Sequence, residues 1–182
     1  DFEEKLRIAD VYENLKKTAN GEIVSDNSKI TFERYIMGSY FEQVLYYANL
    51  RFSKMTGGRY EIVRGESRDK RISAGLEISV RDNFNNKERD ISSLSGGESF
   101  QASLALALGL SDIIQQRNGG IRLDSIFIDE GFGSLDNDSL ASAIETLNDL
   151  TGNGNRLVGI ISHISELKNS IGNKIEVVGT KS

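Results

Sequence analysis

The chain has 182 residues, enough to bury one substantial hydrophobic core, so one domain is expected. Cysteine is absent, which excludes disulfides and thiolate metal sites, and no stretch is long and apolar enough to cross a bilayer, so a soluble, cytoplasmic protein is expected. The net charge of −5 argues against indiscriminate binding to nucleic acid.

The charge is unevenly distributed along the chain. Residues 51–89 carry ten Lys or Arg against six Asp or Glu, a local charge of +4. Ordinary surface charge on a strand-rich segment is enough to explain this excess. A surface that faces DNA is the alternative.

The first nineteen residues carry apolar side chains at spacings of three and four, which predicts an amphipathic helix ended by Asn20-Gly21. The stripe consists of Phe2, Leu6, Ala9 and Tyr12. The pattern leaves two alternatives open, a helix packed on the core and the end of a coiled-coil arm. A polar turn is predicted over 25–28.

A long helix is predicted from Thr31 to the glycine pair Gly57-Gly58, with one apolar stripe. The stripe consists of Phe41, Val44, Leu45, Ala48 and Phe52. Residues 60–63 and 76–80 alternate apolar and polar side chains, which predicts half-buried antiparallel strands joined by an exposed loop.

The second half of the chain contains continuous apolar runs. The run over 100–114 is longer than a strand and predicts a buried helix. The short runs over 126–128 and 157–161 predict parallel strands buried on both sides, with a helix over 137–150 between them and a last strand over 175–178. This order predicts an α/β fold with a parallel sheet, flanking helices and some antiparallel strands.

Polar side chains follow two of the predicted parallel strands. Asp129-Glu130 ends one strand, and Ser162-His163, with the only histidine of the chain, follows the next. Ligands of open α/β sheets bind beyond the carboxyl ends of the strands, so a shared site is expected here. Taken singly, the carboxylates could be helix caps and the histidine a surface residue.

A second candidate site lies at the start of the predicted buried helix. The sequence Ser95-Gly96-Gly97 there offers a hydroxyl and free backbone N–H groups at the positive end of the helix dipole, where an anion can bind. An ordinary serine N-cap has the same geometry.

Four pieces in this order resemble the motifs of ABC-type ATPases: Leu94-Ser95-Gly96-Gly97-Glu98 the signature, the strand ending in Asp129-Glu130 the Walker B motif, Gly131 to Asp136 the D-loop, and His163 the switch histidine. The sequences GFGSLD, after the carboxylates, and LSGGES, before FQASLALALGL, resemble the C-terminal ATPase lobe of SbcC, the SMC-like subunit of a bacterial DNA-end-processing nuclease complex. The resemblance covers the chain from about Thr31 to Val178.

The resemblance implies that residues 1–20 are the end of a coiled-coil arm and residues 21–182 the C-terminal lobe of an ABC ATPase head. It implies ATP and Mg²⁺ as cofactors. Glu130 would be the general base, His163 would contact the γ-phosphate and the attacking water, and Asp129 would hold Mg²⁺ through a water. The implied nucleotide-binding residues are Ser95, Gly96, Gly97, Glu98 and Asp136.

The chain lacks the P-loop sequence G-x-x-x-x-G-K-[ST] and a recognisable Q-loop. The resemblance places both in an N-terminal lobe of the same protein, so this chain is expected to hold half of an active site. The implied partners are that lobe, a second head in a homodimer across ATP, an SbcD-type nuclease subunit and double-stranded DNA ends. A membrane is not among them. The implied location is the bacterial cytoplasm, in association with the nucleoid.

Rival functions share some of these motifs. An SMC-type chromosome-structuring head or an ABC transporter head would have the same four pieces, but the GFGSLD sequence is not typical of either. A structural lobe that dimerises around nucleotide without hydrolysing it would have no need for Glu130 and His163.

Overall fold

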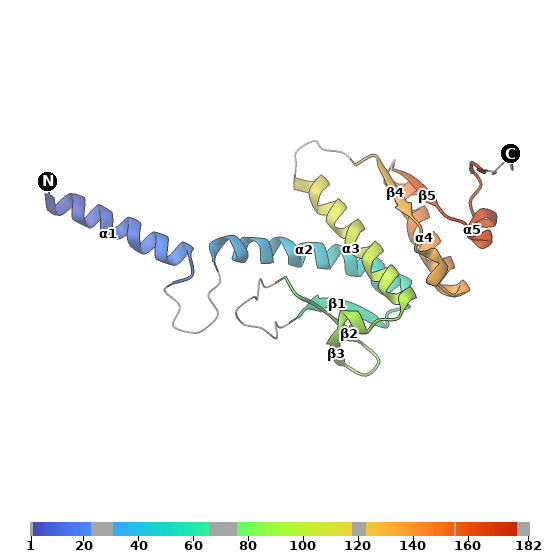
Figure 1. Ribbon diagram of the computed structural model, residues 1–182, viewed down its shortest axis with the longest axis horizontal. Helices are drawn as coiled ribbons and strands as arrows, with labels where there is room; N and C mark the ends of the chain where they lie inside the picture. The colour runs from blue at the N-terminus through green and yellow to red at the C-terminus, as the bar shows by residue number, and fades with distance from the viewer. Residues whose placement is uncertain (1, 23–30, 66–75, 118–122, 155, 178–182) are drawn as a thin grey trace, which may run out of the picture.

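We describe a computed structural model of the chain that places residues 2–22, 31–65, 76–117, 123–154 and 156–177 (Figure 1). The turn predicted over 25–28 and most of the loop between the antiparallel strands lie outside these residues. The fold combines an antiparallel sheet, a parallel strand pair and helices (Figure 1), so the predicted α/β class is confirmed. Among the described helices, none combines the length and apolarity that a membrane span requires.

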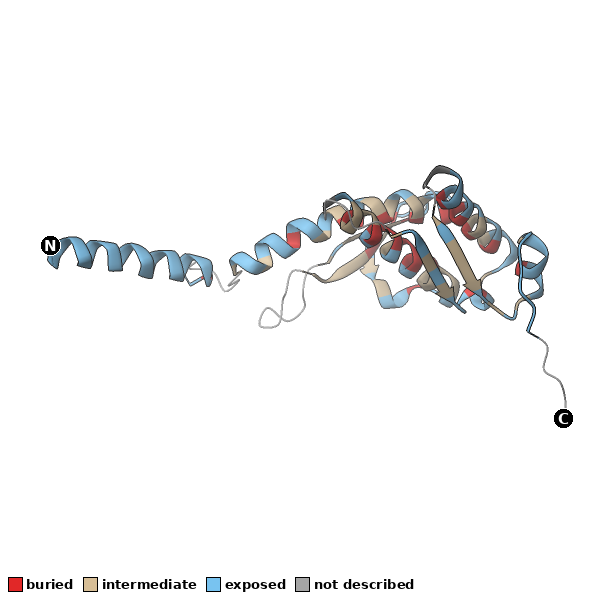
Figure 2. Ribbon diagram, turned by 90° about the horizontal axis from the view of Figure 1, so that it is seen from above, coloured by how far each residue is buried: buried red, intermediate tan, exposed pale blue. Residues whose placement is uncertain are grey.

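Helix α1 (Phe2–Ala19) has no buried residue and extends away from the sheets and from the helices of the second half of the chain, and its neighbouring element is the helix that follows it (Figure 2). It ends where predicted, with Gly21 at φ 70° and the Glu22 N–H donating to the Lys17 carbonyl. Its apolar stripe faces solvent, so the alternative of a helix packed on the core of this chain is wrong.

Helix α2 (Phe32–Met55) begins at the N-cap Thr31, whose hydroxyl accepts from the Arg34 N–H. It ends before Gly57 and Gly58, which have φ of 59° and 79°, conformations that glycine adopts without steric cost. Most of its predicted stripe is buried and Phe41 is half-buried, so the predicted core face is confirmed.

The antiparallel sheet has the order β1-β2-β3, with β1 at Tyr60–Arg64, β2 at Ile78–Asp82 and β3 at Lys87–Asp90. The predicted pairing is confirmed, although β2 begins at Ile78 and reaches Asp82 rather than running over 76–80. Strand β3 escaped prediction, because Lys-Glu-Arg-Asp has no apolar residue and the strand is held by backbone pairing with β2.

Helix α3 (Gly96–Arg117) crosses α2 closely at Gly109. A Cβ on Gly109 would lie 2.6 Å from the Val44 carbonyl oxygen, so only glycine permits this approach. The prediction that α3 is buried is correct for most of its faces, but Ser103, Ala107 and Leu110 form an exposed stripe. The 3₁₀ turn η1 (Ile91–Ser93) leads into this helix.

The parallel pair consists of β4 (Ser125–Asp129) and β5 (Leu157–Ile161), joined through the 3₁₀ turn η2 (Phe132–Ser134) and helix α4 (Asn137–Gly154). The expectation that both strands are buried on both sides is wrong. Phe127 is 70% exposed, Leu157 64% and Ile161 56%, so one face of the pair is open. Continuous apolar runs show that a face is made for burial but not which polypeptide covers it.

The last predicted strand, 175–178, is also wrong over its described residues. Helix α5 (Ser165–Ser170) is followed by irregular backbone, in which Ile175 and Val177 are almost fully exposed. A strand requires a neighbouring backbone for its hydrogen bonds. Val178 lies outside the described residues.

Candidate functional site

The carboxylate and the histidine predicted to share a site lie in contact. Strands β4 and β5 are parallel, and Asp129 lies opposite Ile161, so the residues that follow leave the same edge of the sheet. His163 Nδ1 lies 3.1 Å from Glu130 Oε1 and 3.0 Å from Glu130 Oε2. The predicted proximity is confirmed, and both side chains remain accessible to solvent.

The backbone at Glu130 has an unusual conformation. Its φ is 61°, in the left-handed region that side chains with a Cβ seldom adopt, and Gly131 follows at φ 97°. The Glu130 N–H donates to the Ile161 carbonyl over 2.9 Å, which ties the residue to the end of β5. Such backbone persists only where its surroundings hold it, and it is common at functional sites.

The donor set at this edge fits Mg²⁺ in part. Asp129 lies exposed beside Glu130, and carboxylate oxygens are ligands that Mg²⁺ prefers. Within the described ranges, however, no group of three or more His, Cys, Asp or Glu side chains could hold a metal ion. A magnesium ion here would need most of its ligands from water and from the phosphates of a nucleotide.

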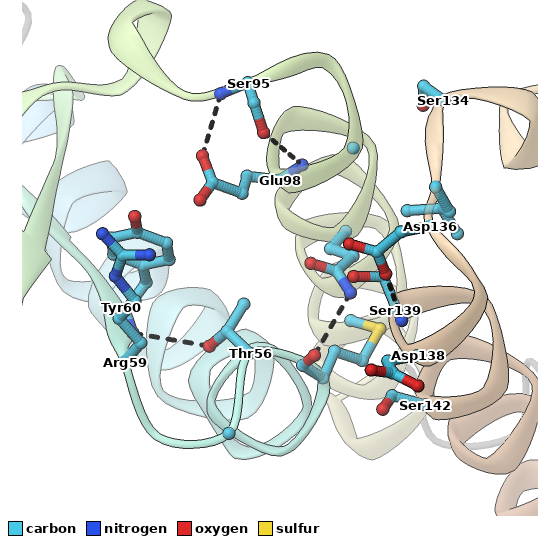
Figure 3. Close-up of a pocket in the computed structure, with 15 residues that line it drawn as sticks. Thr56, Arg59, Tyr60, Ser95, Glu98, Ser134, Asp136, Asp138, Ser139 and Ser142 are labelled. Carbon is cyan, nitrogen blue, oxygen red and sulfur yellow. Dashed lines mark hydrogen bonds between the residues drawn. The ribbon is translucent and has the colours of Figure 1, made fainter.

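The signature turn, Ser95 to Glu98, forms a capping box at the start of α3 (Figure 3). Ser95 Oγ accepts from the Glu98 N–H over 3.3 Å, and Glu98 Oε2 accepts from the Ser95 N–H over 2.9 Å. The N-cap geometry considered from the sequence is therefore present. The first-turn N–H groups of a helix lack partners within the helix, so an anion site on Gly96 and Gly97 is compatible with the cap.

Glu98 is also tied to the antiparallel sheet. Burial by itself would raise the pKa of Glu98, but hydrogen bonds from the Ser95 N–H, the Tyr60 hydroxyl and the Ser95 hydroxyl, helped by the charge of Arg59, hold this pKa below its ordinary value. Burial, together with the hydrogen bond to Glu98, raises the pKa of Tyr60. The carboxylate is thus kept ionised at the first turn of α3, where the helix dipole favours negative charge.

Nothing in the sequence indicates that Arg59 and Tyr60 belong to this region. The Arg59 guanidinium lies 4.7 Å from the centre of the Tyr60 ring, and Arg89 lies 5.4 Å from the same ring, with one of its N–H groups donating to the Tyr60 hydroxyl. An Arg-Tyr pair after two glycines carries no recognisable motif. Only the fold brings it against the signature turn.

A groove of about 400 Å³ runs between the end of α2, the signature turn and the start of α4 (Figure 3). Four predicted nucleotide-binding residues, Ser95, Gly97, Glu98 and Asp136, line it, whereas Gly96 does not. Its other lining residues are Met55, Thr56, Gly57, Arg59, Tyr60, Gln101, Ser134, Leu135, Asp138, Ser139 and Ser142.

Asp136 has a structural role that the sequence did not show. Its Oδ1 accepts from the Ser139 N–H over 2.8 Å, which makes it the N-cap of α4, and this hydrogen bond lowers its pKa. As at Ser95, a predicted ligand of the nucleotide also begins a helix.

The predicted site residues form two clusters. Asp129, Glu130 and His163 do not line the groove, and residues 131–135 connect Glu130 to Asp136, which does. This loop touches the signature turn closely, because a Cβ on Gly97 would lie 2.9 Å from the Ser134 carbonyl oxygen. Gly97 is therefore required for packing whether or not it approaches a phosphate.

Comparison with known proteins matches the chain to one family model, to curated SbcC subunits and to solved structures of SMC ATPases. Residues 66–149 match the model of the SbcC/RAD50-like family that contains the Walker B motif. The chain is 55% identical over 153 residues to the SbcC subunit of the nuclease SbcCD from Staphylococcus epidermidis, and 54% identical over 158 residues to that from Staphylococcus aureus. These alignments cover 84% and 86% of this chain, but only 15% and 16% of the relatives' length.

Solved structures share the fold at low sequence identity. A structure from work on ATP-driven dimerization and DNA-stimulated activation of SMC ATPases aligns with a TM-score of 0.62 and 15% identity, over 81% of this chain and 83% of that one. The SMC head domain from Thermotoga maritima aligns with a TM-score of 0.50 and 20% identity, over 76% of this chain and 44% of that one. These likenesses establish the arrangement of the elements.

Proposed function

The chain is a C-terminal lobe of the SbcC type, and from this premise we propose that it is one half of an ATPase head in a DNA-processing nuclease complex. The observation that carries the proposal is the contact of Glu130 with His163 at the carboxyl ends of two neighbouring parallel strands.

Glu130 and His163 are proposed as the catalytic residues. Phosphoryl transfer requires an oriented water and compensation of the charge on the transferred group, with little covalent chemistry by the protein. Glu130 would orient the water and accept its proton, since its carboxylate is exposed and the residue directly follows the end of β4. His163, in contact with that carboxylate, would lie beside the γ-phosphate.

Asp129 is proposed to hold Mg²⁺ through a water. The ion would neutralise part of the charge on the phosphate oxygens when bound. Asp129 is the last residue of β4 and Glu130 follows it, and both are exposed, so the two carboxylates can serve different groups.

The signature turn is proposed to serve a second nucleotide. Ser95 and Gly97 line the groove, whereas Glu130 and His163 do not, so the two clusters are suited to different nucleotides. In a homodimer of heads, Ser95, Gly96, Gly97 and Glu98 of one head would meet the γ-phosphate held by the other. Asp136 would hold the connecting loop at that interface through its cap on α4.

The missing half of the site is proposed to come from an N-terminal lobe with the Walker A and Q-loop sequences. The open apolar face of β4 and β5, with Phe127, Leu157 and Ile161, supports a partner that covers the parallel pair. The exposed stripe of α1 supports the proposal that residues 1–20 end a coiled-coil arm and residues 21–182 form the lobe.

An SbcD-type nuclease subunit and double-stranded DNA ends are proposed as partners, in the bacterial cytoplasm, by analogy with the relatives that are named as subunits of a nuclease. The structure weakens the argument for DNA from the basic excess over 51–89. Several of its described members form ion pairs with carboxylates: Arg51 with Asp112, Lys54 with Glu145 and Asp149, Arg64 with Glu42, and Arg81 with Glu61 and Glu88. Arg68, Lys70 and Arg71 lie outside the described residues.

The proposal is tested by Glu130→Gln in a head reconstituted with the N-terminal lobe. The amide keeps the shape but cannot accept the proton, so hydrolysis should fall by about 10²–10⁴-fold. ATP binding should remain, and ATP-bound dimers should accumulate. Glu145→Gln, at an exposed carboxylate of α4, is the matched control. Hydrolysis by Glu130→Gln at close to the normal rate would remove Glu130 from the base role.

A further inference from the structure

Phe100, on the first turns of α3, touches the loop that carries Glu130. The space in which Gly131 would hold a Cβ is filled by the Phe100 ring, whose Cε2 would lie 2.2 Å from that atom. Gly131 also has φ 97°, which only glycine adopts readily. The residue after the proposed base is therefore restricted both by its own conformation and by an aromatic ring from another element.

The ring of Phe100 is itself held in place. It meets Phe132 edge to face, with centroids 4.8 Å apart and an interplanar angle of 62°. Phe132 is 1% exposed and belongs to the core. Because Phe132 begins the turn η2, the aromatic pair fixes the loop on the side that follows Gly131.

The same loop is held a second time from the signature turn. The Ser134 carbonyl oxygen lies 2.9 Å from the position that a Cβ on Gly97 would take, and Ser134 Oγ donates to the Gly131 carbonyl over 3.0 Å. Gly97 and Phe100 lie three residues apart on α3, so they present to the same side of the helix. The loop thus contacts α3 at both of these positions.

We propose that Phe100 and Gly131 are positioning residues for ATP hydrolysis, which hold the left-handed backbone of Glu130 so that its carboxylate stays against His163; this inference rests on the proposed function. The left-handed conformation is unfavourable for glutamate and persists only under external constraint. The constraints at hand are the hydrogen bond of the Glu130 N–H to Ile161, the hydrogen bond of Ser134 Oγ to the Gly131 carbonyl, and the Phe100 ring against Gly131. Without the ring, the hydrogen bonds alone do not hold the left-handed backbone, and the carboxylate leaves His163.

The first test uses the chain by itself and requires no activity. His163 is the only histidine, so its imidazole gives a single set of NMR signals. Glu130→Ala should move these signals, and Phe100→Ala should reproduce most of that movement. Leu108→Ala removes a buried side chain of the same helix, 1% exposed, and should leave the signals in place. Phe100→Leu keeps the apolar volume without the ring and replaces Phe100→Ala if that variant does not fold.

The second test uses the head reconstituted with the N-terminal lobe. Phe100→Ala and Gly131→Ala should each lower kcat by about 10²-fold, the scale of a misplaced catalytic group, with the KM for ATP and ATP-driven dimerisation unchanged. The double variant should be no slower than the slower single variant, because the two residues act through one contact. Leu108→Ala should lower the melting temperature and leave kcat unchanged.

Three results would overturn the inference: His163 signals unmoved in Phe100→Ala, signals unmoved even in Glu130→Ala, or kcat effects that multiply in the double variant. An inactive wild-type head would remove the proposed function instead. The His163 signals would then still decide whether Phe100 positions Glu130.

Discussion

Ser95 and Glu98 show how one residue serves the helix and the proposed ligand together. Each accepts a hydrogen bond from the backbone of the other, so the signature turn is rigid before any nucleotide arrives. A preformed turn binds phosphate without the cost of ordering the loop. The cap and the phosphate site are therefore compatible interpretations of the same residues.

The proposal that Ser95 acts in trans, on the nucleotide held by the other head, can be tested with Ser95→Arg in the reconstituted head. The larger, charged side chain should block the approach of a phosphate held by the other head, so dimerisation and hydrolysis should be lost while ATP binding to a single head remains. Ser95→Asn, which keeps an N-cap acceptor, controls for loss of the cap.

A mixing experiment then separates trans from cis. Heads with Ser95→Arg are combined with heads that carry a P-loop lysine substitution in the N-terminal lobe. One site of the mixed dimer should contain both lesions and the other neither, so activity should partly return. If mixing restores nothing, Ser95 acts within its own head.

The low pKa of Glu98 predicts an acid-sensitive capping box. A carboxyl group whose pKa is lower in the folded chain contributes stability above its unfolded pKa, and this contribution is lost as the pH falls through the folded pKa. Glu98→Gln can keep the capping box without titrating. The stability advantage of the wild type over Glu98→Gln should therefore be largest at neutral pH and shrink below about pH 4.5, the unperturbed value.

This prediction is measured by urea unfolding across the acid range. Glu4→Gln, on the solvent-exposed α1, is the control. An advantage that stays constant down to the lowest pH at which the chain folds would contradict the prediction.

At the scale of the elements, the crossing of α2 and α3 positions the signature turn. The two helices approach so closely at Gly109 that an added methyl group would meet the Val44 carbonyl at 2.6 Å and the Ala48 N–H at 2.7 Å. Backbone atoms cannot move aside as a flexible side chain does. The start of α3, with its capping box, is thereby fixed relative to α2 and the groove.

Gly109→Ala should lower the free energy of unfolding by about 1–3 kcal/mol, the usual cost of overpacking. Gly152→Ala is the matched control on α4, since nothing lies within 4 Å of its Cβ position and its φ is ordinary. That variant should gain about 0.5–1 kcal/mol from helix propensity. Chemical denaturation of the two variants measures both free energies of unfolding and so separates the cost of overpacking from the gain in helix propensity. A Gly109→Ala variant more stable than the wild type would contradict the close crossing of α2 and α3.

At the scale of the whole molecule, the chain contains the proposed hydrolytic pair, Glu130 and His163, and the signature turn, but its sequence has no P-loop. The parallel pair has an open apolar face, and the segment after α5 finds no strand to join in the described structure. These features agree with a lobe that is completed by another polypeptide segment.

The isolated chain is therefore expected to bind ATP poorly, since no Walker A backbone and lysine hold the β- and γ-phosphates. Addition of the N-terminal lobe should produce Mg²⁺-dependent binding, measured by calorimetry. Tight binding by the isolated chain would refute the half-site hypothesis. Phe127→Asp, on the open sheet face, should weaken the gain from the added lobe. Phe84→Asp, at an exposed aromatic residue in the turn between β2 and β3, should not.

The sequence by itself determined the features that arise from neighbouring residues. The C-terminal ends of α1 and α2 follow from local glycines, and the N-cap at Ser95 follows from a serine just before the apolar helix. The meeting of Glu130 and His163 could also be predicted, because residues that follow parallel strands leave the same edge of a sheet.

The tertiary structure decided what depends on contacts between distant segments. Strand β3 has no apolar residue and forms by pairing with β2. Arg59 and Tyr60, at the start of β1, line the groove beside the signature turn. The left-handed turn at Glu130 is held by Phe100, thirty residues earlier in the chain. Whether β4 and β5 are buried on both faces, and whether residues 175–177 form a strand, depends on which other segments pack against them. A hydrophobic pattern indicates that a face prefers burial. It does not indicate which segment covers that face or which backbone pairs with it, because both come from other parts of the fold.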